Sequence, residues 1–403
     1  MVVTIVVLLI LAGISLNLVL GQNGIISRAQ DARNQTVEGQ VNTEKAVNAL
    51  TDEMEDLISE NENSGNGGNS GSSQTTVENV VIPEGYYYVG GTKAKGLVIS
   101  DAEADNEKYK GQENVGKDLA GNQWVWVPVE TPSSLYTTVT EGVALSGSTG
   151  VKTTKYTNSA IISGRTRGLP GSTDYREPDI LPYSGFDDTN YATAGFSSLA
   201  NMAETMVSEY EEMIASLEKY KGFYIGRYEL TANGEKTGAT QTCRNGVNWY
   251  TLYKNCTTLA SGSKVKTRMI LGLQWDATCK WLDSSGFNIT NSSTWGNYSN
   301  NTADGHESKQ NTGFSESWKA NNIYDFAGNC YEFTQEAYDA SYRAYRGGGY
   351  NGNGSLDPAS RRLNDNPTGA DSFSGSRPTL YLIPWDIEAM SSKEELKTSM
   401  TRN

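Results

Sequence analysis

The pattern of apolar and polar residues divides the chain into a hydrophobic N-terminal segment, an amphipathic helix, a polar linker and a long mixed region. Met1–Leu20 has no charged residue, and a helix of this length rises about 30 Å, enough to cross a bilayer. Apolar residues at three- and four-residue steps continue the helical pattern to Glu60. Residues 61–76 contain almost nothing that can be buried. We therefore expect a membrane helix with a stalk over residues 1–60 and a flexible linker over 61–76.

The mixed region predicts one globular domain over residues 77–386 and a polar tail over 387–403. Within it, Asn122–Val129 places aromatic residues and valines on opposite faces of a strand. Glu130–Thr193 is rich in Ser, Thr, Gly and Tyr and predicts an irregular insertion. Two helices are expected, an amphipathic one over Leu199–Leu217 and a second from about Thr267 to Leu282.

Charge and residue usage narrow the class of protein. A net charge of −14 argues against nucleic acid as a partner, because phosphates would be repelled. Abundant Gly, Asn, Ser, Thr and Tyr favour an extracellular, loop-rich β domain. The four cysteines match no zinc pattern. Cys243 and Cys256 could close a short loop as a disulfide, and Cys279 is expected to be a buried free thiol.

The stretch Asn321–Thr334, N-N-I-Y-D-F-A-G-N-C-Y-E-F-T, carries the densest chemistry of the chain. It alternates aromatic residues with two carboxylates, Asp325 and Glu332, around a Gly-Asn step, which predicts a strand interrupted by a tight loop. The loop can curl so that both carboxylates and the carbonyls between them face one point, a cage of oxygens suited to Ca²⁺. The alternative is a β-turn with two solvated acids.

This stretch resembles the core motif of the formylglycine-generating enzyme (sulfatase-modifying factor) family, N-x-Y-D-M-A-G-N-V-W-E-W-T. Further segments resemble the family's pattern in the same order, and together they cover about Gly222 to Leu382: Gly222–Glu229, Gln274–Trp281, Arg346–Tyr350 and Ser374–Pro378. The resemblance implies an α+β fold, an elaborated C-type-lectin-like domain. It also implies one structural calcium ion, held by the side chains of Asp325 and Glu332 and the carbonyls of Gly328 and Cys330.

The family's catalytic chemistry is not expected here. Its enzymes need a cysteine pair shortly after the R-G-G motif, and Tyr350–Arg361 contains no cysteine. The related iron-dependent enzymes need several histidines, whereas His306 is the single histidine of the chain. We therefore predict a protein that is not an enzyme.

Tyr and Asn among Gly and Ser follow the core motif, and this mixture is typical of paratopes. In the C-type-lectin-like proteins that are diversified by retroelements, the corresponding region is the variable ligand surface. We expect Arg346 and Arg377 to be internal. Five polar residues should cluster on one exposed face as ligand-binding candidates: Tyr350, Asn351, Asn353, Asp357 and Asn364. The alternative is that these polar loops are merely solvated.

The N-terminal run resembles the helix of type IV prepilins and pseudopilins, although the basic leader, the Gly before the cleavage point and the acidic residue after it are absent. Either the true reading frame starts upstream or residues 1–20 form a plain membrane anchor. The sequence thus predicts a bacterial cell-surface protein of the adhesin or receptor kind, anchored in the membrane or in a pilus, with an extracellular head that binds protein or glycan. The alternative is a structural pilin or pseudopilin subunit that contacts other pilus subunits. A formylglycine-generating oxidase is disfavoured by the missing thiols.

Overall fold

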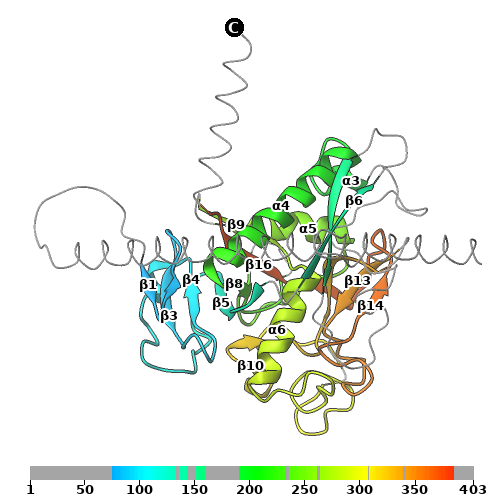
Figure 1. Cartoon of the computed structure of the whole chain (residues 1–403). Coiled ribbons are helices and arrows are strands. Elements are labelled where there is room, and N and C mark those ends of the chain that lie inside the picture. Colours follow the sequence, from blue (N-terminus) through cyan, green and yellow to red (C-terminus); the bar gives the residue numbers. More distant parts are fainter. Residues whose placement is uncertain are drawn as a thin grey trace, which may run out of the picture. The chain divides into compact units, whose positions relative to one another are not determined.

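The computed structural model describes residues 75–132, 136–143, 151–158, 190–231, 236–260, 264–306, 308–338 and 342–384 (Figure 1). The predicted membrane helix and stalk, all but the end of the linker, and the polar tail lie outside the described residues. The chain divides into two units, and every described residue belongs to the second, Ser73–Asn403. Within these ranges, no helix is both long and apolar enough to cross a membrane.

A six-stranded antiparallel sheet forms the centre of the fold, in the order β3-β4-β5-β8-β16-β9. Strand β16 lies between β8 and β9, so the C-terminal strand of the described chain is an inner strand of the sheet (Figure 1). The strands are β3 (Tyr87–Gly90), β4 (Val98–Ser100), β5 (Gln123–Pro128), β8 (Gly222–Gly226), β16 (Pro378–Leu382) and β9 (Val265–Met269).

The two faces of this sheet are buried in different apolar clusters. Val125 and Val127 of β5 belong to the first cluster, whereas Trp124 and Trp126 belong to the second. The predicted alternation of valines and aromatic residues along this strand is confirmed. Because both faces are covered by apolar side chains, the sheet serves as the internal frame of the domain.

Helices pack on this frame. The predicted amphipathic helix is confirmed as α4 (Leu199–Tyr220), which packs against β8 and β16. Ser198 caps its first turn, since the Ser198 side chain accepts a hydrogen bond from the Asn201 N–H. The second predicted helix starts later than expected, at α6 (Gly272–Ser284). Its first predicted residues belong instead to β9, where β-branched side chains pair with β16. The other helices are α3 (Asn190–Thr193), α5 (Trp249–Cys256) and the 3₁₀ turns η1 (Glu103–Asp105) and η3 (Glu316–Trp318).

A second sheet, in the order β14-β13-β12-β15, carries the end of the core motif and the segment that follows it. Its strands are β12 (Tyr331–Ala337), β13 (Arg343–Arg346), β14 (Leu363–Asp365) and β15 (Ser374–Ser376); β15 runs parallel to β12 and the other pairs are antiparallel. Two-stranded pairs are β1 (Thr76–Val77) with β2 (Val80–Val81), β6 (Tyr136–Val143) with β7 (Val151–Asn158), and β10 (Lys319–Ala320) with β11 (Ile323–Tyr324).

The structure therefore mixes helices with a majority of strands, as the α+β prediction requires. The predicted insertion Glu130–Thr193 is less irregular than expected, because its described part contains the antiparallel pair of β6 and β7 and the short helix α3. Thr, Val and Tyr are frequent in these two strands, and all three have high strand propensity.

Candidate functional site

The core motif folds as a strand, a tight turn and a second strand, as predicted. β11 ends at Tyr324, β12 begins at Tyr331, and the turn between them places Asp325, Gly328 and Asn329 at positive φ. At Gly328 a Cβ atom would lie 2.4 Å from the Asn297 carbonyl oxygen, so this position requires glycine. The turn is fixed by the Gly328 N–H, which donates to the Gly347 carbonyl at 2.9 Å. The core motif is thereby joined to the R-G-G turn.

Three carboxyl groups and one guanidinium meet beneath this turn, and we call Glu229, Asp325, Glu332 and Arg377 the carboxyl cluster. All four are at most 1% exposed. Arg377 donates to both oxygens of Glu332, at 2.6 Å to Oε1 and 2.9 Å to Oε2, and also to the carbonyls of Gly226 and Tyr324. The prediction that Arg377 is internal is confirmed, and the alternative of two solvated acids is wrong.

The carboxyl cluster has more acid groups than one guanidinium can neutralise, and this shifts their pKa values. Burial raises the pKa of Asp325 to about 7, and the nearby Glu332 charge adds to the rise, while the Gly313 N–H and Arg377 oppose it. Burial also raises the pKa of Glu229 and, with Arg377 opposing, that of Glu332. The cluster therefore favours a bound proton or a bound cation.

Of the two predicted carboxylate ligands for calcium, Asp325 fits a hard cation and Glu332 does not. Asp325 Oδ2 accepts a hydrogen bond from the Gly313 N–H at 2.7 Å, whereas Asp325 Oδ1 is buried with no hydrogen-bond partner in the described part of the chain. That oxygen is suited to a calcium ion. Glu332, in contrast, already receives the Arg377 guanidinium on both oxygens, and a cation there would meet a positive charge.

Glu229 is a member of the cluster that the sequence analysis missed. Its Oε2 accepts from the Asn329 amide at 2.7 Å and its Oε1 accepts from the Cys330 N–H at 2.9 Å. A signal was present, because Glu229 follows three aromatic residues and an arginine in a largely apolar segment, where a solvated acid is not expected.

The cysteines pair differently from the short-loop prediction. Cys330 of the core motif forms a disulfide with Cys243, and Cys256 is a buried free thiol. The Cys243–Cys256 pairing is wrong because Cys256 ends α5 within the core, where its Sγ lies 3.9 Å from the Ser376 hydroxyl. Cys279 is buried and free, as expected. A Glu229 oxygen and the two disulfide sulfurs lie within 4.8 Å of one another, but a disulfide has no thiolate to offer a metal.

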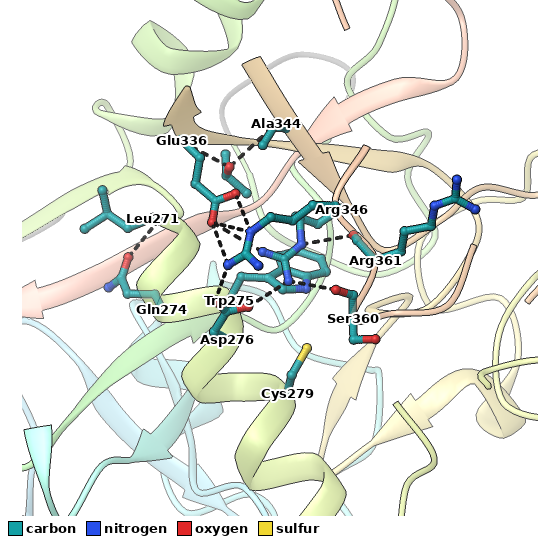
Figure 2. Close-up of polar contacts among 12 residues, drawn as sticks. Leu271, Gln274, Trp275, Asp276, Cys279, Glu336, Ala344, Arg346, Ser360 and Arg361 are labelled. Carbon is teal, nitrogen blue, oxygen red and sulfur yellow. Dashed lines mark hydrogen bonds and ion pairs between the residues drawn. The ribbon is translucent and has the colours of Figure 1, made fainter. Parts of the chain in front are cut away.

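A second group of buried charges supports the R-G-G turn, and we call Asp276, Glu336, Arg346 and Arg362 the guanidinium network. Arg346 lies between Asp276, at 2.8 Å, and Glu336, at 3.3 Å, and it also donates to the carbonyls of Ser360 and Arg361 (Figure 2). Arg362 pairs with the same two carboxylates. Two cations and two anions balance, so the network is structural and not a site of spare charge. Arg346 is internal, as predicted, whereas Glu336 and Arg362 were missed.

The five ligand-binding candidates lie on two neighbouring pieces of structure. Four of them lie in the loop Tyr350–Asp357, which we call the surface loop, and Asn364 lies on the edge strand β14. Asn351 is exposed and the other four are half-buried. Within the loop, the Asn353 backbone carbonyl accepts from the N–H groups of Leu356 and Asp357, and the Asp357 carboxylate pairs with Arg361 at 2.5 Å.

Two tyrosines connect the surface loop to β14, and the sequence analysis did not single them out. The Tyr331 ring lies against Gly349 and Gly352 and meets the Tyr345 ring edge-on at 4.6 Å. Tyr345 is the register partner of Leu363 in β14. Burial raises the pKa values of both Tyr331 and Tyr345, and the nearby Asp357 charge adds to the rise. Both rings are therefore neutral phenols. The loop therefore packs on the face of the sheet that carries Tyr331, Tyr345 and Leu363, whereas Asn364 is the register partner of Ala344 and lies on the opposite face.

Comparison with known proteins gives no family assignment. No protein-family model matches the chain, and no curated protein matches it. Among solved structures, it is similar to Treponema denticola variable protein 1, at 17% identity and a TM-score of 0.30, over 41% of this chain and 85% of that one. It is also similar to CarF, at 12% identity and a TM-score of 0.29, over 41% of this chain and 87% of that one. TM-scores this low do not establish a shared fold.

Proposed function

We propose that this chain is a non-catalytic binding protein, with a head like that of the formylglycine-generating enzymes and C-type lectins, that recognises a protein or glycan through the surface loop and β14. In this proposal residues 1–20 hold the head at the bacterial cell surface, either as a simple anchor or within a pilus. One structural calcium ion at Asp325 belongs to the same proposal.

One observation carries the proposal: the surface loop is polar, and hydrogen bonds from the buried frame fix both of its ends. Buried Arg346 donates to the carbonyls of Ser360 and Arg361, just after the loop, and the Tyr350 N–H at its start donates to the Asn329 carbonyl at 2.9 Å. A loop held at both ends presents Tyr and Asn side chains at a small entropic cost on binding. Enzymes also place loops on rigid frames, so a fixed loop alone does not distinguish a binding protein from an enzyme. The side chains available for catalysis must do so.

The chemistry of the described thiols supports binding over catalysis. Tyr350–Arg361 has no cysteine, and burial raises the pKa of the Cys256 thiol to about 12 and that of Cys279 as well. A thiol that is buried and neutral is a poor nucleophile and a poor copper ligand. Neither free cysteine is therefore a replacement for the family's catalytic pair.

The proposal is tested by screening the full chain, purified in detergent, on arrays of glycans and of surface proteins. The probe variant replaces Tyr350, Asn351, Asn353, Asp357 and Asn364 by alanine. The matched control is Phe314→Ala, an aromatic residue that is 49% exposed elsewhere on the head. We expect array features that bind the wild type and the control but not the probe variant. Binding that survives in a folded probe variant would refute the assignment of this surface.

A further inference from the structure

A second loop lies directly against the surface loop, and we call residues 288–300 the companion loop. The Ser292 N–H donates to the Gly354 carbonyl at 2.8 Å. The Ser299 N–H and hydroxyl both donate to the Gly352 carbonyl, at 3.0 Å and 2.7 Å. A Cβ atom on Gly354 would lie 2.6 Å from a backbone nitrogen of the companion loop, so this close approach requires glycine. A ligand on the surface loop therefore borders the companion loop.

The two loops are polar but carry almost no charge. Residues 284–302 and residues 347–356 contain no charged side chain, although 20% of the residues of the chain are charged. Asp357, at the end of the surface loop, is paired with Arg361. The exposed positions are instead amides and hydroxyl groups: Asn288, Asn291, Thr294, Ser299, Asn351 and Ser355. A ligand that covers both loops would therefore meet hydrogen-bonding groups and no unpaired ion.

Three of the asparagine amides are held in one orientation by their own loops. Asn291 Oδ1 accepts from the Ser293 N–H at 3.3 Å and from its hydroxyl at 2.7 Å. Asn288 Oδ1 accepts from the Asn291 N–H at 2.9 Å. Asn353 Oδ1 accepts from the N–H and the hydroxyl of Ser355, at 2.9 Å and 2.7 Å. None of the three Nδ2 groups has a hydrogen-bond partner in the described part of the chain. The loops thus hold three amide donors in place before a ligand arrives, which reduces the entropy lost on binding.

We propose that the ligand is an uncharged glycan, bound by the surface loop and the companion loop together, with Asn288 and Asn291 as specificity-determining residues. This inference rests on the proposed function and selects one of its two ligand classes. An amide Nδ2 carries two donor hydrogens, and a sugar hydroxyl both accepts and donates. The closely spaced hydroxyl groups of a neutral sugar therefore match a surface of amides and hydroxyls.

The composition of the two loops favours a glycan over a protein as the ligand. More than half of the area of a typical protein–protein interface is apolar, and its core is rich in aromatic residues, Met and Arg. Among the described residues of the two loops, Leu356 is the one large apolar side chain that is strongly exposed, at 39%. The aliphatic and aromatic residues Ile289, Trp295 and Tyr298 of the companion loop are buried. The loops thus lack the apolar centre that a protein partner requires.

The class of ligand is tested with the full chain, purified in detergent, on arrays that carry neutral glycans, sialylated or sulfated glycans, and surface proteins. We expect binding to neutral glycans. Since no ion pair forms in such a complex, the Kd should change less than about twofold between about 0.1 M and about 1 M NaCl.

The role of the companion loop is tested by Asn291→Asp and by Asn288→Asp. Each variant keeps Oδ1, and so the hydrogen bonds within the loop, but replaces the Nδ2 donor by an oxygen. We expect each to raise the Kd for the neutral glycan by about fivefold or more. The matched control is Asn201→Asp on α4, an exposed amide whose Oδ1 also accepts from a serine hydroxyl, that of Ser197 at 3.4 Å. It should bind as the wild type does, and urea midpoints show whether all the variants fold.

The outcomes separate this inference from the proposed function. Binding to proteins or to acidic glycans alone would overturn the uncharged glycan and leave a binding protein in place. A neutral glycan whose Kd is unchanged in both companion-loop variants, but which is lost when the five surface candidates are replaced by alanine, would also overturn this inference alone. The absence of any ligand on the arrays would overturn both.

Discussion

Replacing Arg377 by methionine should strongly destabilise the domain, because the carboxyl cluster would lose its one guanidinium. Arg377→Met removes the ion pair to Glu332 and the donors to the carbonyls of Gly226 and Tyr324. Removing one partner of a buried ion pair costs about 3–5 kcal/mol, and each carbonyl left without a donor adds about 1 kcal/mol or more. We expect a loss of about 5 kcal/mol near pH 7, a large part of the stability of an ordinary domain.

Urea unfolding followed by tryptophan fluorescence measures this loss. With a slope of about 3 kcal/mol per molar urea, the midpoint should fall by roughly 1.7 M. The loss should shrink at acid pH, where the carboxyl groups take up protons and no longer need the guanidinium. Arg361→Met is the matched control, because its partner Asp357 is half-buried, and it should cost less than about 1 kcal/mol. Equal losses in the two variants would refute the account of the carboxyl cluster.

Three further predictions follow from the site. Calcium should raise the melting temperature relative to a chelator, and Asp325→Asn should abolish the difference; identical curves would exclude the ion. Without calcium, the pKa of Asp325 is about 7 in the folded state against an ordinary 3.8. Protonated Asp325 therefore stabilises the folded state fully below pH 3.8, and this stabilisation is lost as the pH rises to 7. The free energy of unfolding should fall by at most about 4 kcal/mol over this range. Urea midpoints at pH 4.5 and pH 8 should therefore differ less in Asp325→Asn than in the wild type. A sulfatase-motif peptide should gain no aldehyde by mass spectrometry, with or without copper, and turnover above background would contradict the non-catalytic proposal.

The local pattern of the sequence predicted those parts of the fold that local physics determines. The alternation in Asn122–Val129 fixed both faces of a central strand, and the Gly-Asn step in the core motif predicted its turn. The strand β9 was misread as the start of a helix, since its pairing with β16 joins residues more than a hundred positions apart. Tertiary pairing overrides local propensity in such a segment.

The same distinction applies to the candidate site. The carboxylates of the core motif stand out in the local sequence, whereas the internal position of Arg377 was predicted from the family resemblance. The disulfide could not, since Cys243 and Cys330 are 87 residues apart and spacing alone does not select a partner. Tyr331 and Tyr345 acquire their roles only when separate strands are brought together, and the sequence does not show that the partners of Glu229 are Asn329 and Cys330.

The central claim is that the surface loop binds a ligand, and Tyr350 is the aromatic residue of that loop. The most direct measurement is the Kd of an array-selected ligand for the wild type, Tyr350→Ala and the control Phe314→Ala, with urea midpoints to show that all three fold. The account predicts that Tyr350→Ala weakens binding about 30-fold, corresponding to about 2 kcal/mol, while the control binds as the wild type does. Equal Kd values for wild type and Tyr350→Ala, or the absence of any ligand on the arrays, would contradict it.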